Sequence, residues 1–476
     1  MSNWLKKEHC ENTAFEPRKN DDVNTGLPLG LLKSDGKNHA LSPINYHGRA
    51  HMFCVAPSGA GKSQSLAIPA LLEWPHSAIV LDVKGELFFH TAGYREKELG
   101  HKIYRFDPSD PKGHKFNPLS FIDNDQFAIE QSVTDIVDVI IPIPDDVREK
   151  FFLRAARQIL SVAIHYLVWQ SPSVTPPMRD LVKLCYDVSL FHEALEKIVS
   201  LDIDKQNGLP DSIRNIANGL RAQFFAPDSH TETDLESQPQ LNRAGQSVWA
   251  ELANQISPLN SEQIKAVTKT TDWTPSSLRA GKTTVYVTLP PSAKGQYRAI
   301  MALVLNAHLG QLLNELPDHD SPPILILLDE MPQLGHMRAI EQVIDLGRGY
   351  GLLLYGFSQR RSQIKKAYGD DSDFLGTFEV RAYMNPSPED GTADMLSKAI
   401  GERSKPSGTG AQMSTVSVAP ANELCGRNFK DDIIILSRGC NPARVKKSMA
   451  YQDETLCQKM KIQSSSGKRY APLKEP

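Results

Sequence analysis

The sequence predicts an α/β fold that is interrupted by an inserted all-α domain. Two observations support this prediction. Short, continuously apolar runs alternate with longer amphipathic segments, and the alternation stops between about residues 125 and 245. Continuous apolar runs are typical of strands in a parallel sheet that is covered on both faces. Alternating strands and helices form such a sheet through right-handed crossovers, and 476 residues give room for two or three domains.

Strands are expected where a short apolar run ends at a turn or a polar residue. Five runs fit this description: "HMFCVA" (51–56), "SAIVLDV" (77–83), "KTTVYVTL" (282–289), "ILILLD" (324–329) and "GLLLYGF" (351–357). Between the last three of these runs lie two amphipathic segments, 296–316 and 337–349, which we expect to be helices.

Within the interruption, apolar residues recur at the spacing of one helix face, at positions 129, 133, 136, 137, 140 and 141. Helix-like segments continue over 151–168 and 190–201. We therefore divide the chain into a polar amino-terminal segment (1–25), an α/β domain (26–124 and 246–460), an inserted all-α domain (125–245) and a carboxy-terminal tail (461–476). The stretch 403–420 is rich in Ser, Thr, Gly and Pro, which predicts a flexible loop.

The charges are distributed unevenly along the chain. Residues 121–240 carry 19 Asp and Glu against 10 Lys and Arg, a net charge of −9. The remainder carries 43 basic and 37 acidic residues, a net charge of +6. Such a difference suggests two domains with different partners. An acidic region is unsuited to phosphate backbones, so we expect 121–240 to bind a protein; a solvated acidic face is the alternative.

Composition also argues against several classes of protein. The six cysteines form no C-x-x-C pair, which argues against a disulfide framework or a zinc site and fits a reducing cytosol. The amino terminus has no apolar run of the secretory kind. No stretch reaches the roughly 20 apolar residues of a membrane helix. The nearest candidate, 151–168, carries Arg154, Arg157 and His165, so we expect a buried helix there.

The stretch "APSGAGKS" (56–63) fits a relaxed phosphate-loop pattern between an expected strand and an expected helix. Glycines let the backbone point its N–H groups at phosphate, and the positive end of the following helix adds to this attraction. Lys62 would reach the terminal phosphates, and the Ser63 hydroxyl would bind Mg²⁺. The residues expected around an ATP phosphate chain are Pro57, Ser58, Gly59, Ala60, Gly61, Lys62, Ser63 and Gln64.

Two features of this stretch are unusual. Ala56 stands where the pattern normally has its first glycine, and Pro69 lies inside the expected helix. A small residue still fits at position 56. The alternative to a nucleotide site is a glycine-rich turn without a ligand, and the strand and helix on either side favour the nucleotide site.

A second part of the predicted nucleotide site is the acidic pair at the end of the strand "ILILLD" (324–329). We expect Asp329 to hold Mg²⁺ through a bound water and Glu330 to polarise the attacking water, because phosphoryl transfer depends on positioning and charge compensation. Alone, this pair would be equally compatible with an acidic turn. Gln359 ends the next apolar strand and would sense the γ-phosphate or orient the water.

The motif "VLDVKGE" (80–86) places Asp82, Lys84 and Glu86 just beyond another strand. Ligands of open parallel sheets bind outside the carboxyl ends of the strands, so we expect these side chains near the same site. Solvated turn charges would give the same pattern.

Longer blocks of the sequence resemble the TraG/VirD coupling ATPases of type IV secretion and conjugation systems. The blocks are "APSGAGKSQSLAIPALLEWPHSAIVLDVKGE", "IYRFDPSDPKGHKFNPLSF" and "LLDEMPQLGHMRAIEQVIDLGRGYGLLLYGFSQRRSQIKKAYG", followed by "PSPEDGTADMLSKAIG" (386–401). The resemblance runs from about Gly26 to about residue 460. Proline occurs at the position of Pro69 in the family, which implies a tolerated kink.

The resemblance implies a RecA-like motor domain with an inserted all-α domain, assembled as a homo-hexamer that binds ATP and Mg²⁺ between subunits. Lys62, Ser63, Asp329, Glu330 and Gln359 match the family's motif positions. A neighbouring subunit would supply an arginine to the site. Our candidate is Arg348 in "LGRGYG", and the competitors are Arg360, Arg361 and Arg381.

The resemblance also implies a function. Members of the family recruit a relaxase bound to single-stranded DNA, or effector proteins, to the subunits of a type IV secretion channel and couple ATP hydrolysis to export. They usually carry amino-terminal membrane helices, and this sequence shows none. We therefore expect a cytoplasmic protein that reaches the inner face of the cytoplasmic membrane through a partner, or that works unanchored.

Two other functions fit parts of the sequence. A double-stranded DNA translocase would share the motor core, but "FNPL" (116–119) and the all-α insertion favour the coupling protein. An adaptor that binds ATP without hydrolysing it is disfavoured by intact Lys62, Asp329 and Glu330. Basic "QRRSQIKK" (359–366) would either contact DNA phosphates in the ring pore or form a solvated helix face.

Overall fold

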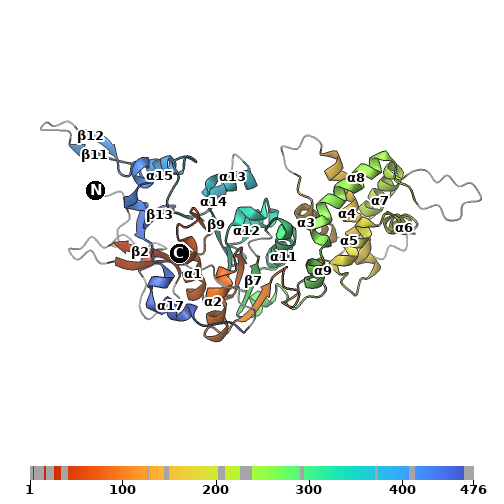
Figure 1. The fold of residues 1–476 in the computed structure, drawn as a ribbon, viewed down its shortest axis with the longest axis horizontal. Helices are drawn as coiled ribbons and strands as arrows, with labels where there is room; N and C mark the ends of the chain where they lie inside the picture. Colours follow the sequence, from red (N-terminus) through yellow and green to blue (C-terminus); the bar gives the residue numbers. More distant parts are fainter. Residues whose placement is uncertain are drawn as a thin grey trace, which may run out of the picture. The chain divides into compact units, whose positions relative to one another are not determined.

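The computed structural model describes residues 4, 15–17, 26–33, 41–123, 125, 128–143, 150–201, 209–225, 239–289, 294–369, 374–406 and 413–465 (Figure 1). The chain folds into two compact units. The sheet unit comprises Met1–Arg105, Pro275–Pro291 and Leu312–Pro476, and the helical unit comprises Phe106–Thr274 and Ser292–Gln311. The α/β fold with an all-helical part is confirmed. The boundaries 125–245 that the sequence suggests for the inserted domain stay a prediction.

The sheet unit is built on six neighbouring strands that contain every apolar run expected to form a strand. Their order is β10 (Val380–Tyr383), β4 (Met52–Val55), β9 (Leu352–Ser358), β8 (Ile324–Leu328), β5 (Ala78–Asp82) and β7 (Thr283–Thr288), and each neighbouring pair is parallel. Nearly every residue of these strands is buried, as continuous apolar runs require. Parallel pairing brings their carboxyl ends to one edge of the sheet.

Strands outside this centre extend the sheet to twelve strands among the residues that the structure describes. Beyond β7 lies β6 (Lys102–Phe106). Beyond β10, each strand pairs antiparallel with the next: β13 (Asp432–Ser437), β14 (Ala443–Lys446), β2 (Leu27–Lys33), β3 (Leu41–Tyr46) and β1 (Phe15–Pro17). Apart from Trp4 and β1, the polar segment 1–25 lies outside the described residues.

Helices flank the sheet and connect its strands. They are α1 (Ile68–Glu73), α2 (Glu86–Lys97), α10 (Ser277–Ala280), α12 (Arg338–Leu346), α13 (Arg361–Tyr368), α14 (Phe374–Thr377), α15 (Thr392–Ile400), α16 (Ala421–Leu424) and α17 (Glu454–Met460). The start of the tail, residues 461–465, runs along α2, where Glu96 accepts a hydrogen bond from Ser464 at 2.7 Å. Residues 466–476 lie outside the described part of the chain.

A fully buried arginine joins three elements of the sheet unit. Arg95 on α2 is 0% exposed and donates to the carbonyls of Leu71, Trp74 and His76 at 2.6–2.7 Å. Its Nε donates to the Thr284 hydroxyl on β7 at 2.9 Å. Burial lowers the pKa of Arg95 to about 10, so the guanidinium is still charged near pH 7. Arg95 therefore fastens the end of α1 to α2 and the sheet.

The helical unit contains α3 (Ile129–Ile140), α4 (Phe151–Gln170), α5 (Met178–Tyr186), α6 (Val188–Val199), α7 (Asp211–Phe224), α8 (Arg243–Ile256) and α9 (Glu262–Val267), together with most of α11 (Lys294–Asn314). The face of α3 predicted from its periodicity is buried at Ile129, Val133, Ile136, Val137 and Ile140. Helix α3 therefore contributes one apolar face to the core of the helical unit.

Helix α4 is the one described helix that is long and apolar enough to cross a membrane by length and composition. Most of it is buried inside the structure, including His165 at 1% exposed. Arg157 forms an ion pair with Asp138 on α3. These contacts fit the buried helix expected from the sequence.

The serine-, threonine- and glycine-rich stretch 403–420 overlaps two strands. β11 (Glu402–Pro406) and β12 (Met413–Ser417) pair antiparallel in a separate two-stranded sheet. Residues 407–412 lie outside the described part, and the flexibility of the stretch stays a prediction.

Candidate nucleotide-binding site

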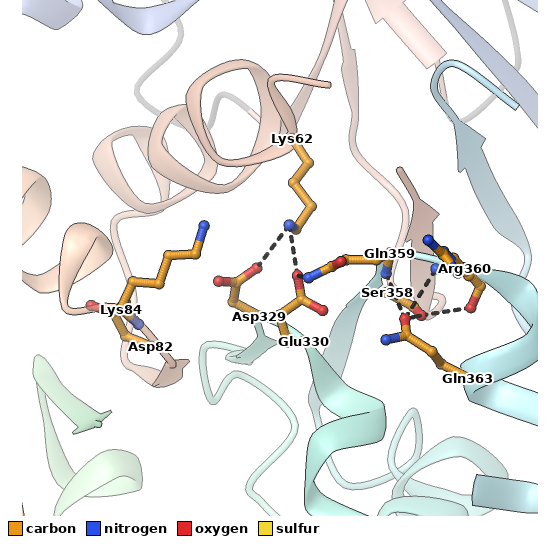
Figure 2. A network of polar contacts seen from close by, with 9 residues as sticks. All are labelled: Lys62, Asp82, Lys84, Asp329, Glu330, Ser358, Gln359, Arg360 and Gln363. Atoms are coloured by element: carbon orange, nitrogen blue, oxygen red, sulfur yellow. Dashed lines mark hydrogen bonds and ion pairs between the residues drawn. The ribbon is translucent and has the colours of Figure 1, made fainter. Parts of the chain in front are cut away.

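The residues of the predicted site lie at the carboxyl ends of four adjacent strands. The glycine-rich loop follows β4, Gln359 follows β9, Asp329 and Glu330 follow β8, and Asp82 ends β5. Figure 2 shows that Lys62, Asp329, Glu330 and Gln359 converge there. The strand order β4-β9-β8-β5 brings residues together that lie up to 300 positions apart in the sequence.

The loop has the backbone geometry that a phosphate cradle needs. Gly59 and Gly61 have φ angles of +79° and +86°, which residues with a side chain rarely adopt. Ser58 and Gly59 are exposed, whereas Ala56 is 0% exposed and its N–H donates to the Ser358 carbonyl at 2.9 Å. The small side chain at position 56 is therefore explained by burial at the end of β4.

The helix after the loop begins with a π-helical turn, Ser63–Ala67, that leads into α1. The N–H of Ile68 donates to the carbonyl of Ser63, five residues earlier. Pro69 has no N–H and would crowd the carbonyl four residues before it in an ordinary α-helix. The wider turn accommodates this proline, and such turns often occur at functional sites.

Lys62 forms the centre of the polar network. Its Nζ lies 2.8 Å from Glu330 Oε1 and 4.0 Å from Asp329 Oδ1, and all three side chains are buried. Gln359 Nε2 donates to the same Glu330 Oε1 at 2.8 Å. In this structure the ammonium therefore faces both acids, in the place where a phosphate would attract it.

Burial shifts the pKa values of the acids in this network. The pKa of Asp329 is raised to about 7, chiefly by burial and against the attraction of Lys62. Burial likewise raises the pKa of Asp82 to about 6, opposed by backbone N–H groups that include Phe88 at 2.8 Å. Burial alone would lower the pKa of Lys62, but Asp329 and Glu330 outweigh it, so the pKa is raised.

Two carboxylate oxygens in this network have no hydrogen-bond partner in the described part of the chain. Asp329 Oδ1 and Glu330 Oε2 are both buried and accept no hydrogen bond, although Asp329 Oδ1 lies 4.0 Å from Lys62 Nζ. Glu330 also has a φ of +60°, a conformation that costs about 1 kcal/mol or more for a residue with a side chain. Buried unpaired carboxylate oxygens are suited to a metal ion or a bound water, so the donor set fits Mg²⁺.

Gln363 fixes the strand end that carries Gln359. Its Oε1 accepts from the Ser358 hydroxyl and from the backbone N–H groups of Gln359 and Arg360, at 3.1–3.2 Å. These bonds also cap the start of α13. The position of Gln359 is therefore determined by its own strand and by the following helix.

The structure brings some of the secondary candidates to the site and places others elsewhere. Asp82 and Lys84 lie beside Asp329 in Figure 2, and the charge of Lys84 lowers the pKa of Asp329 slightly. Glu86 begins α2. Met449 also lies against the loop, which no sequence motif indicates: a Cβ added at Gly61 would lie 2.6 Å from Met449 Cε. No motif surrounds Met449, so only tertiary structure reveals this contact.

The arginine candidates divide between the two edges of the sheet. Arg348 is exposed and follows α12 just before β9 begins, so it lies at the amino edge, opposite Lys62. Its charge helps lower the pKa of His51 at the amino end of β4, although burial is the larger cause. Arg360 and Arg361 directly follow Gln359, and Arg381 lies in β10. Within one chain, Arg348 is not part of the network around Lys62.

The sequence matches the family described as "Type IV secretory system Conjugative DNA transfer" over residues 2–471. The chain belongs to this family. Among its curated relatives, the conjugal transfer protein TraG of Escherichia coli is 24% identical over 440 residues, which cover 84% of this chain and 64% of TraG. Protein VirD4 of Rhizobium radiobacter is 28% identical over 448 residues, which cover 89% of this chain and 60% of VirD4. The chain thus spans less than two thirds of the length of these relatives.

Solved structures of conjugative coupling proteins share the fold. The unbound monoclinic form of the bacterial conjugative coupling protein TrwBdeltaN70 aligns with a TM-score of 0.64 and 13% identity, covering 94% of both chains. The plasmid coupling protein TrwB in complex with ADP and Mg²⁺ aligns with a TM-score of 0.60 and 14% identity, covering 84% of this chain and 85% of TrwB. These likenesses confirm a RecA-like phosphate-loop NTPase fold with an all-α domain.

The raised pKa of Asp329 predicts a pH dependence of stability. Between the unfolded pKa of 3.8 and the folded value of about 7, the folded chain binds a proton that the unfolded chain does not. The free energy of unfolding without nucleotide should therefore fall as the pH rises from about 4 to about 7. Asp329→Asn should melt at a higher temperature than wild type at pH 8 and depend less steeply on pH.

Thermal unfolding at pH 5 and pH 8 without nucleotide checks this prediction. Asp345→Asn on α12, where Asp345 is exposed, is the matched control and should follow the wild type. A melting temperature for Asp329→Asn below that of wild type at pH 8 would contradict the assigned direction of the shift.

Proposed function

We propose that this chain is an ATP-driven coupling protein that recruits a relaxase bound to single-stranded DNA, or effector proteins, to a type IV secretion channel. ATP hydrolysis would drive the transfer. The observation that carries the proposal is the convergence of Lys62, Glu330 and Gln359 within 2.8 Å contacts beside a glycine-rich loop. The chain's membership of the conjugative DNA transfer family supports the transfer role. Nucleotide binding is supported by structures of TrwB in complex with GDPNP, with ADP and Mg²⁺, and with ADPNP.

Residues 57–64 would surround the phosphates of ATP, with the N–H groups of the loop and the start of the helix directed at them. Ser63 and Asp329 would hold Mg²⁺, and the bound metal supplies charge compensation for the phosphates. Asp329 Oδ1, which is buried and accepts no hydrogen bond, supports this assignment. Asp329 must be ionised to bind the metal, so nucleotide binding should favour the deprotonated carboxyl.

Lys62 would exchange its carboxylate partners for the terminal phosphates. This exchange would leave Glu330 Oε1 with one protein donor, Gln359, in place of the two that it has in this structure. Glu330 is then able to accept a proton from an attacking water, which Gln359 orients. Loss of the Lys62 contact would thus leave the Glu330 carboxylate available when nucleotide is bound.

The proposed assembly is a homo-hexamer in which Arg348 completes the site of the neighbouring subunit. Its place at the amino edge of the sheet supports a role in trans, because it cannot reach Lys62 of its own chain from there. Arg360, Arg361 and Arg381 remain competitors. We further propose a cytoplasmic location with membrane contact through a partner, DNA contact by the basic residues of 359–366, and binding of the relaxase or effector by the acidic region 121–240.

The proposal is tested by ATPase assays with and without DNA, using Lys62→Ala as the control for contaminating activity. Stimulation of the wild type by single-stranded DNA is expected. Stimulation by double-stranded DNA alone would indicate a duplex translocase. A wild-type rate no higher than that of Lys62→Ala under every condition would leave only an ATP-binding adaptor.

A further inference from the structure

One segment, residues 449–465, connects the glycine-rich loop to the last turn of helix α2. We name this segment the carboxy-terminal strap. It contains a 3₁₀ turn (Ala450–Gln452), helix α17 (Glu454–Met460) and the start of the tail (461–465). Its 3₁₀ turn packs against the π-helical turn Ser63–Ala67, and α17 packs against α1 and α2 (Figure 1). The strap therefore contacts the helix that continues from the loop and the helix that follows β5.

At one end of the strap, Met449 packs against the glycine-rich loop. Its Cε lies 2.6 Å from the place where a Cβ on Gly61 would stand. The Gly61 carbonyl accepts from both the N–H and the hydroxyl of Ser65, at 2.8 Å each. Gly61 has a φ of +86° and directly precedes Lys62. Met449 and Ser65 therefore hold the turn from which Lys62 extends.

Contacts with the core of the sheet unit hold the strap behind Met449. Ala450 is 0% exposed and Leu456 is 5% exposed, and both belong to the apolar core. Asp453 caps α17 by accepting from the N–H of Leu456 at 3.0 Å. These contacts keep Met449 in place against the loop.

At the other end of the strap, the tail crosses α2 at a glycine. A Cβ on Gly93 would lie 2.0 Å from the carbonyl oxygen of Ile462, so a side chain at this position would push the tail backbone away. Alanine is the better helix former, and α2 by itself would be more stable with alanine there. The glycine therefore serves the docking of the tail.

Glu96, three residues further along α2, holds the tail by hydrogen bonds. Its Oε2 accepts from the Ser464 hydroxyl at 2.7 Å and from the Ser465 N–H at 2.8 Å. Partial burial would raise the pKa of Glu96, but the hydrogen bonds from the two serines outweigh it, so the pKa is lowered. The carboxylate is therefore ionised at neutral pH, and its hydrogen bonds are of the strong, charge-assisted kind. Lys459 adds a cation–π contact, with its Nζ 4.9 Å from the centre of the Tyr94 ring.

We propose that Met449 is a positioning residue for the phosphate loop and that the strap couples phosphate binding in the loop to its own docking on α2. The inference rests on the proposed ATP site. Met449 acts through the backbone of Gly61 and needs no contact with the base or ribose. The docked strap favours the loop conformation that binds phosphate, so bound phosphate favours the docked strap by the same factor.

Met449→Ala tests the positioning role with two ligands, ATP and inorganic tripolyphosphate, which carries the phosphates without base or ribose. Because Met449 acts on the loop, the affinities for both ligands should fall by the same factor, about threefold to tenfold. Met449→Leu restores most of the lost volume and should recover most of the affinity. Met395→Ala, at a half-buried methionine on α15, is the control and should bind both ligands as wild type does.

Hydrogen exchange followed by mass spectrometry tests the coupling. In wild type, ATP and tripolyphosphate should each slow the exchange of peptides from the strap and leave peptides from α15 unchanged. Gly93→Ala should abolish this slowing at 461–465 and weaken the binding of both ligands about twofold to fivefold. Glu96→Ala should act in the same direction, because it removes the acceptor of the tail's hydrogen bonds. Glu98→Ala, at an exposed position just after α2, is the control.

The outcomes separate this inference from the proposed function. If wild type binds neither ATP nor tripolyphosphate, the proposed ATP site fails and the inference falls with it. If both bind, but Met449→Ala changes neither affinity or neither ligand slows exchange in the strap, the ATP site stands and the inference is overturned. A loss of affinity for ATP alone would also overturn it, because Met449 would then contact the base or ribose. If Met449→Ala does not fold, Glu96→Ala and the exchange of the wild type decide.

Discussion

Glu330→Gln is expected to bind ATP as tightly as wild type and to lose about 10²–10⁴-fold in its rate of hydrolysis. Glutamine has the same shape, and its amide oxygen can still accept from Lys62 and Gln359, the two donors that lie 2.8 Å from Glu330 Oε1. It cannot accept a proton from water. Nucleotide binding and catalysis should therefore separate cleanly at this position.

Single-turnover hydrolysis and equilibrium binding of a fluorescent ATP analogue provide the two measurements. Glu315→Gln is the matched control, because Glu315 is exposed after α11 and away from the network. A Glu330→Gln rate within threefold of wild type would remove Glu330 from the role of general base. A parallel loss of nucleotide affinity would show that its charge is needed for binding.

Arg95→Met is expected to lower the free energy of unfolding by about 3–5 kcal/mol. It leaves several buried carbonyls without a hydrogen-bond donor, and each such carbonyl costs about 1–3 kcal/mol of stability. Arg95 is 0% exposed and donates to three backbone carbonyls. The loss would be a large part of the about 5–15 kcal/mol typical of a domain. The end of α1, the helix that continues from Lys62, would also lose its attachment to the sheet.

Urea unfolding followed by circular dichroism measures this loss. Lys97→Met is the control on the same helix, because Lys97 is exposed. The expected result for the control is a change within about 0.5 kcal/mol, as for most surface substitutions. A loss below 1 kcal/mol for Arg95→Met would mean that water or a shifted backbone satisfies the carbonyls.

The central sheet was predictable because its strands are buried on both faces and therefore apolar throughout. The five runs named from the sequence correspond to β4, β5, β7, β8 and β9. The antiparallel strands β2 and β3 escaped notice because they contain Gly30, Pro28 and Pro43, residues that usually mark turns. Their place in the sheet depends on pairing with β14, more than 400 residues away in sequence.

Some features of the candidate site were predictable from the sequence, and others were not. The order of polar residues at strand ends indicated that Lys62, Glu330 and Gln359 belong to one edge, because parallel strands align their carboxyl ends. The 2.8 Å contact between Lys62 and Glu330 was not predictable, since the same lysine was expected to face phosphate.

The π-turn at Ser63–Ala67 has a consequence for how firmly the phosphate loop is positioned. The ordinary α register normally has the lower energy in a helix, and π turns are rare. Pro69 has no N–H to donate in either register, but its ring would clash with the Ser65 carbonyl in the ordinary one. This clash favours the wide register found at Ser63–Ala67. Pro69, a residue type that usually breaks helices, thus favours one hydrogen-bond register over the other. This register sets the direction of the side chains that precede it.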